Sequence, residues 1–105
     1  MDEQEAWSEI YRTSGEKWAD CEGAASILEE TKSAVLAQMM SKLGDIPVSH
    51  AEKQAKASDE WLEFVTKMVK ARQAANLAKI NLEYAKLKFM EWNSANATRR
   101  VEMRL

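Results

Sequence analysis

The residues of this chain that could perform chemistry are few and isolated. His50 is the only histidine and Cys21 the only cysteine, so neither a base-assisted nucleophile nor a histidine–cysteine metal site has its other members. Neighbouring acids such as Asp59 and Glu60 are most simply a solvated helix face. The sequence contains no glycine-rich phosphate loop and no Gly-x-Ser-x-Gly turn. We therefore expect a protein that is not an enzyme and that uses no metal or cofactor.

The richest cluster of side chains lies near the C-terminus, where basic and aromatic residues alternate. Such a mixture can bind phosphates and stack bases, but tryptophan and arginine also anchor protein interfaces. The net charge of −2 opposes non-specific DNA binding and favours a protein partner. The candidate partner-binding residues are Phe89, Trp92, Arg99, Arg100 and Met103. The alternative is a nucleic-acid surface made of Lys86, Lys88, Arg99, Arg100 and Arg104.

Helices must position these side chains, because apolar residues recur at helical spacing in both halves of the chain. In the second half the spacing alternates between four and three residues, which is the coiled-coil period. A similar seam runs from Trp7 to Met39, and Gly15, with a second helix-start pattern from Thr13 to Glu16, favours a kink there. The main seam consists of Ala57, Trp61, Phe64, Met68, Ala71, Ala75, Ala78, Leu82, Ala85, Phe89 and Trp92.

One turn separates the two seams. Gly44 suits a helix C-terminal cap, Pro47 stops the first helix, and Ser49 with Glu52 forms a capping box for the next. The sequence predicts an all-α fold in one domain, 1–105: an antiparallel two-helix hairpin with helices 3–43 and 50–103 and a turn over 44–49. Acidic residues predominate in 1–30 and basic ones in 51–105, so the two helices attract each other. Pairing the two helices about the turn gives a register in which the numbers of two facing residues add up to about 92. In that register, residues beyond about 90 of the second helix have no partner helix.

The second helix carries more apolar residues than one partner can cover. A helix that is apolar on most faces is normally buried by several neighbours, so we expect a homodimer with a four-helix arrangement. The second apolar stripe consists of Leu62, Val65, Val69, Leu77, Ile80, Tyr84, Leu87 and Met90.

The expected compartment is the cytoplasm. No apolar run approaches the ~18 residues that a membrane span needs, and the acidic start, Met1 to Glu5, lacks the basic residues of a signal peptide. A single cysteine is typical of a reducing compartment.

Several runs along most of the chain resemble a group of short helical bacteriophage and prophage proteins. These runs are Glu29–Leu36, Pro47–Glu52, Ala55, Ala57–Trp61, Trp92–Ser94 and Arg99 with Glu102–Arg104. The resemblance is to products encoded near phage recombination and replication genes. It implies an accessory role in the cytoplasm of an infected bacterium, in which the protein binds a host defence or nuclease complex or a phage recombination protein. It implies no catalytic residue.

Overall fold

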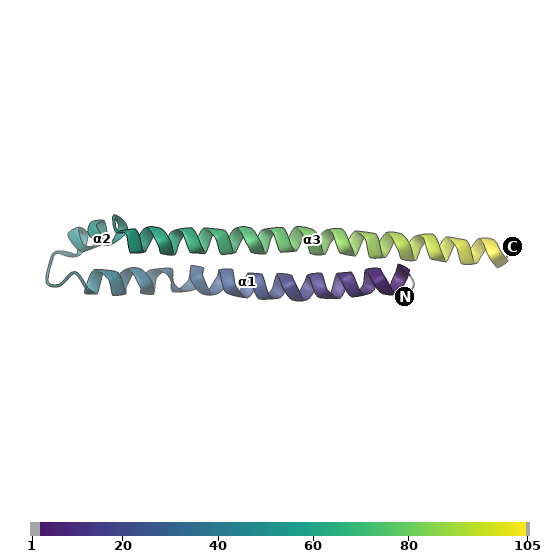
Figure 1. Cartoon of the computed structure of the whole chain (residues 1–105), viewed down its shortest axis with the longest axis horizontal. Helices are drawn as coiled ribbons and strands as arrows, with labels where there is room; N and C mark the ends of the chain where they lie inside the picture. Colours follow the sequence, from purple (N-terminus) through teal and green to yellow (C-terminus); the bar gives the residue numbers. More distant parts are fainter. Residues whose placement is uncertain (1–2, 105) are drawn as a thin grey trace.

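Two long helices lie side by side and antiparallel along almost the whole molecule (Figure 1). The structure, a computed structural model, describes residues 3–104 and the side chains of residues 5–103. The helices are α1 (Glu3–Ser41), α2 (Val48–Lys56) and α3 (Asp59–Arg104), with no strand in the described part. The molecule measures 83 × 20 × 17 Å, with a radius of gyration of 23.1 Å, against about 13 Å for a compact chain of this length. The predicted all-α hairpin is confirmed.

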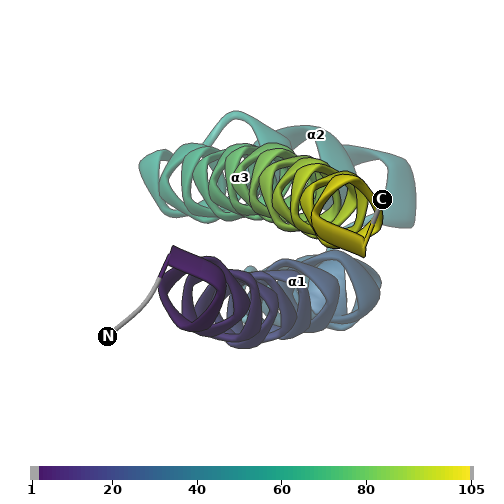
Figure 2. The same cartoon turned by 90° about the vertical axis from the view of Figure 1, so that its right-hand side faces the viewer.

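A break at Ala57–Ser58 interrupts the single helix expected over residues 50–103. Ser58 caps α3, because its Oγ accepts a hydrogen bond from the Trp61 backbone N–H at 3.2 Å and donates one to the Ala55 carbonyl at 2.6 Å. Asp59 and Glu60 follow in the first turn of α3, where negative charge offsets the helix dipole. The short helix α2 therefore sits at the closed end of the hairpin, beside the start of α3 (Figures 1 and 2).

The predicted capping box at the start of this segment does not form. α2 begins at Val48, directly after Pro47, and no side chain caps it. Ser49 lies within the helix, and Glu52 instead forms an ion pair with Lys56 at 2.8 Å. Pro47 is the residue just before the helix, and its φ of −53° and ψ of 141° lie in the extended region that proline favours.

Helix α1 continues without a break through the predicted kink at residues 13–16. The Thr13 hydroxyl donates to the Glu9 carbonyl at 3.0 Å, inside the helix, and so does not start a new one. Gly15 faces Leu82 of α3, whose Cδ1 would lie 3.7 Å from a Cβ built at this position. The chain turns after Ser41, and Gly44 adopts a φ of +86°, which glycine reaches without a steric cost.

Alanine makes up six of the seven buried apolar residues in the described part of the chain. Among the described residues, the side chains that are less than 2% exposed are all small. Small residues on facing helices let the two backbones approach closely. The predicted seam is buried or half-buried from Trp61 to Trp92, whereas Ala57, at the end of α2, is exposed. The buried apolar residues are Ala25, Ala51, Ala55, Trp61, Ala75, Ala78 and Ala85.

One arginine ties the two long helices together through charge. Arg72 of α3 donates to Glu22 of α1 at 2.7 Å and to Glu29, one heptad further along α1, at 2.6 and 2.9 Å. The hydrogen bond from Arg72 holds the pKa of the Glu29 carboxyl below its ordinary value. Since Arg72 reaches both carboxylates, this pairing fixes how the two helices are aligned.

Candidate functional site

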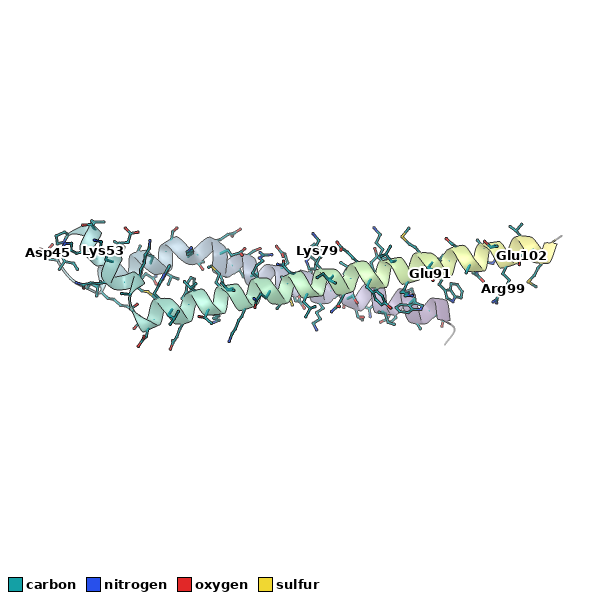
Figure 3. All side chains as sticks on the ribbon, turned by 90° about the horizontal axis from the view of Figure 1, so that it is seen from above. Asp45, Lys53, Lys79, Glu91, Arg99 and Glu102 are labelled. Carbon is teal, nitrogen blue, oxygen red and sulfur yellow. The ribbon has the colours of Figure 1, made fainter. Side chains whose placement is uncertain are left out.

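The hairpin ends unevenly at its open end, where α3 extends beyond α1 (Figure 1). At 1.5 Å per residue, positions 93–104 form an extension of about 18 Å. Figure 3 shows side chains, including Arg99 and Glu102, projecting from this part of α3 where no second helix lies beside it. A surface cleft lies beside the N-terminal end of α1.

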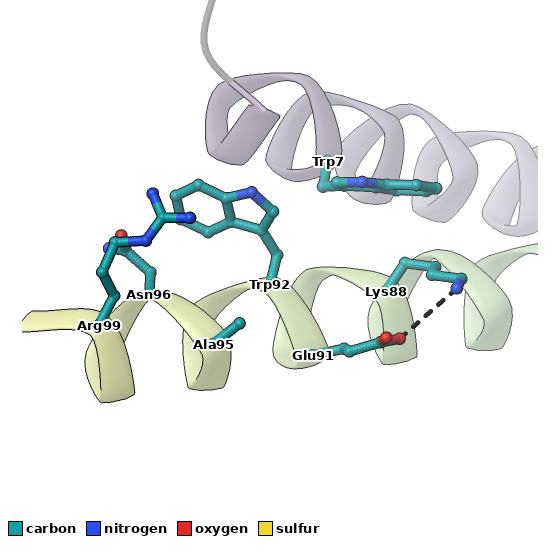
Figure 4. Close-up of a pocket in the computed structure, with 7 residues that line it drawn as sticks. All are labelled: Trp7, Lys88, Glu91, Trp92, Ala95, Asn96 and Arg99. Carbon is teal, nitrogen blue, oxygen red and sulfur yellow. Dashed lines mark ion pairs between the residues drawn. The ribbon is translucent and has the colours of Figure 1, made fainter. Parts of the chain in front are cut away.

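This cleft, which we call the tryptophan cleft, has a volume of about 380 Å³. One wall comes from α1 and the other from three successive turns of α3, since residues three and four apart share a helix face. In Figure 4 the Trp92 indole projects from α3 toward the N-terminal end of α1, and a gap separates it from the Trp7 indole. The lining residues are Trp7, Lys88, Glu91, Trp92, Ala95, Asn96 and Arg99.

The two cations of the tryptophan cleft differ in how they are held. Lys88 forms an ion pair with Glu91 at 3.5 Å, and its Nζ lies 5.7 Å from the centroid of the Tyr84 ring. Arg99 is exposed and makes no ion pair within the described part of the chain. The Arg99 guanidinium is therefore the group available to bind a carboxylate or phosphate from outside.

The structure separates the predicted partner-binding residues. Trp92 and Arg99 line the tryptophan cleft together. Phe89 instead lies within the hairpin, where its ring packs against Tyr11 with centroids 6.0 Å apart. Arg100 and Met103 are exposed outside the cleft, and Met103 is 80% exposed.

The alternative nucleic-acid residues are also divided. Lys88 and Arg99 line the cleft, whereas Lys86 and Arg100 are exposed elsewhere on α3. The side chain of Arg104 lies outside the described residues. Within the cleft Glu91 pairs with Lys88, so the positive potential here is partly cancelled.

The site residues that the sequence did not single out as binding residues are Trp7, Glu91, Ala95 and Asn96. The predicted register placed Trp7 near Ala85, and in the structure its ring meets Tyr84, with centroids 6.4 Å apart. The cleft nevertheless extends from Trp7 to Trp92. The spacing of Trp92, Asn96 and Arg99 on one face of α3 was the available signal for Asn96.

The described residues contain no group of three or more His, Cys, Asp or Glu arranged to hold a metal ion. Among the described helices, none has a stretch both long and apolar enough to cross a membrane. Comparisons with protein-family models, curated proteins and solved structures give no match to this chain.

Proposed function

We propose that this chain is a non-enzymatic accessory protein that acts by binding another protein, with the tryptophan cleft as the contact. The observation that carries the proposal is the pairing of Trp7 and Trp92, from different helices, around a cleft of about 380 Å³ bordered by Arg99. Tryptophan and arginine most often dominate binding energy at protein interfaces. Both tryptophans are half-buried, so a partner can still cover the remaining surface.

The resemblance to short phage and prophage proteins supports a partner in the bacterial cytoplasm. On that basis the target is a host defence or nuclease complex, or a phage recombination protein, whose action this chain modulates. A carboxylate beside an apolar side chain is the chemistry that the cleft favours, because Arg99 can pair with the first and the tryptophan rings can cover the second.

Affinity purification of the tagged chain from infected bacteria tests this proposal. Arg99→Ala should lose the partner, whereas Arg100→Ala, which removes the same charge one residue outside the cleft, should retain it. Trp92→Ala should also lose it, with binding weakened about 30-fold or more, as at interface hot spots. Failure of the wild-type chain to recover any specific protein, or equal effects of the two arginine variants, would refute the proposal.

The second candidate function is binding of single-stranded nucleic acid. The observation in its favour is that the same cleft joins two indole rings with Lys88 and Arg99, and bases stack on such rings while cations contact the backbone. The test is fluorescence anisotropy of a labelled oligonucleotide at low salt. Binding should weaken with salt and disappear in the Arg99→Ala/Arg100→Ala double variant, and no anisotropy change at low salt would end this alternative.

Self-association is part of the proposal. It is supported by a core in which six of the seven buried apolar residues are alanine, while several large apolar side chains of α3 stay more than half exposed. Further burial by a second copy would supply the core that the single hairpin lacks.

A further inference from the structure

Large apolar side chains remain mostly exposed along α3, on the side turned away from α1, and Tyr84 at its border also meets Trp7 of α1. We call six of them the outer stripe, and their relative exposures run from 57% to 65%. The four central members are spaced by three, four and three residues, and the outer two lie 15 and 14 residues away, so all six fall on one side of a 3.6-residue helix. The outer stripe consists of Leu62, Leu77, Ile80, Tyr84, Leu87 and Val101.

The outer stripe has the symmetry that an antiparallel pair of identical helices requires. In a two-fold interface, residue i of one copy meets residue j of the other, and j meets i. About a centre at Leu82, Leu77 pairs with Leu87 and Ile80 with Tyr84, so that both pairs of numbers sum to 164. The outer members, Leu62 and Val101, sum to 163. Each of these six residues therefore meets another of the six, and Val69, 46% exposed on the same side of α3, would meet Ala95.

Charges beside the outer stripe fit the same arrangement. The numbers of Lys79 and Glu83 add up to 162. Lys79 of one copy therefore faces Glu83 of the other, near the two-fold axis, and this pair occurs twice. Neither makes an ion pair within the described hairpin. The antiparallel arrangement also brings the acidic first turn of α3, Asp59 and Glu60, toward the C-terminal end of the other copy, where basic residues outnumber acidic ones. A parallel pair would place like charges together.

The surface area that two outer stripes would bury against each other is also in the range of a stable interface. At ~100 Å² for each largely exposed apolar side chain, the twelve side chains of two stripes bury roughly 1,200 Å², the lower end of the range for specific complexes. A second copy of α3 can reach all of them, because the overlap is about 60 Å long at 1.5 Å per residue.

We infer that a second copy of this chain covers the outer stripe, in an antiparallel α3–α3 pair centred on Leu82. This inference rests on the proposed helix-mediated binding and names the occupant of one surface. The tryptophan cleft adjoins this contact, because the Tyr84 ring meets Trp7 and lies under Lys88; Arg99 is not a member of the outer stripe and stays available to the other partner.

Sedimentation equilibrium of the purified chain over micromolar concentrations tests the contact. The wild-type chain should be a dimer, and Ile80→Lys should raise the dissociation constant by about 30-fold or more. The matched control is Ile27→Lys on α1, because Ile27 is exposed to 64% against 61% for Ile80, and both have a glutamate three residues later. A monomeric wild-type chain, or equal weakening by the two variants, would overturn the inference.

Charge exchange tests the pairing without removing apolar surface. Lys79→Glu alone should weaken the homodimer, because position 79 and position 83 of the facing copy are then both negative. Glu83→Lys alone should weaken it too, because both positions are then positive. By symmetry each repulsive pair occurs twice in the dimer. Mixing the two variants should restore a tight heterodimer, since both pairs then become attractive. Absence of this recovery would overturn the predicted register.

Spin labels attached to Lys70→Cys, in a chain that also carries Cys21→Ala, test whether the two α3 helices run antiparallel or parallel. In the antiparallel register Lys70 lies opposite Ser94, which puts the two labels about 36 Å apart along the axis. A parallel pair would place them roughly one helix diameter apart, about 10 Å, and a short distance would overturn the inference.

These measurements separate the two proposals. A monomeric chain that still captures a partner through Arg99 would refute only the dimer. A dimer of the stated register that captures none would refute only the partner-binding function.

Discussion

Glycine-to-alanine changes at two positions should shift stability in opposite directions. Gly23 lies inside α1, and a Cβ built there meets nothing within 4 Å outside the helix's own backbone. Gly23→Ala should therefore gain the full difference in helix propensity, about 1 kcal/mol. Gly44 has a φ of +86°, where an alanine pays roughly 1–2 kcal/mol for the left-handed conformation. Gly44→Ala should destabilise the hairpin by that amount.

Urea denaturation followed by far-ultraviolet circular dichroism measures both free energies of unfolding. Protein concentration must be equal in every sample, because self-association adds a concentration-dependent stabilisation. The two variants should differ from each other by about 2–3 kcal/mol. Gly15→Ala provides a third point: its Cβ would meet Leu82 at an ordinary contact distance of 3.7 Å, so it should stabilise like Gly23→Ala. If Gly23→Ala lowers stability, or Gly44→Ala leaves it unchanged, the assigned backbone conformations are wrong.

We call the break at Ala57–Ser58 between α2 and α3 the elbow. Three further predictions concern the elbow, the helix interface and pH. Ser58→Ala should cost about 1 kcal/mol of unfolding free energy because it removes the cap of α3, whereas Ser49→Ala, at a serine that caps nothing, should cost less than half as much. Ala75→Leu should cost about 1–3 kcal/mol because Ala75 is fully buried between the helices, and Ala74→Leu, on the exposed side, should be close to neutral in the same urea assay. The arginine partner of Glu29 holds the pKa of that carboxyl below its ordinary 4.5, so the ion pair stabilises fully above that pH and is lost as the pH falls through the lowered pKa. Glu29→Gln should remove this part of the acid sensitivity, seen by comparing urea midpoints at neutral and acidic pH; an unchanged acid dependence would contradict it.

The hairpin could be predicted from sequence because its two determinants are local. The alternating spacing from Trp61 to Trp92 defines the inner face of α3, and Gly44 with Pro47 defines the turn. The elbow at Ser58 was missed because the apolar spacing continues across it. A serine followed by two acids was the available signal, since such a sequence caps a helix and offsets its dipole.

The candidate site was only half predictable. Trp92 and Arg99 belong to one face of one helix, so their proximity follows from spacing alone. Trp7 comes from the other end of the chain, and whether it reaches Trp92 depends on the alignment of α1 against α3. That alignment is determined by tertiary contacts, such as the bond from Arg72 to Glu22, which helical periodicity does not specify.

The alignment by Arg72 gives the molecule a defined length. Glu22 and Glu29 are one heptad apart, and Arg72 binds both, so sliding by a heptad in either direction leaves one carboxylate behind. The two helices are thus held in one alignment, and the nearest alternative alignment is one heptad, about 10.5 Å, away along the helix axis. Inserting seven residues into each long helix on the open side of Arg72 would move the tryptophan cleft outward by that distance while keeping the closed end unchanged. The separation between the elbow and the cleft is therefore a quantity that can be tuned in steps.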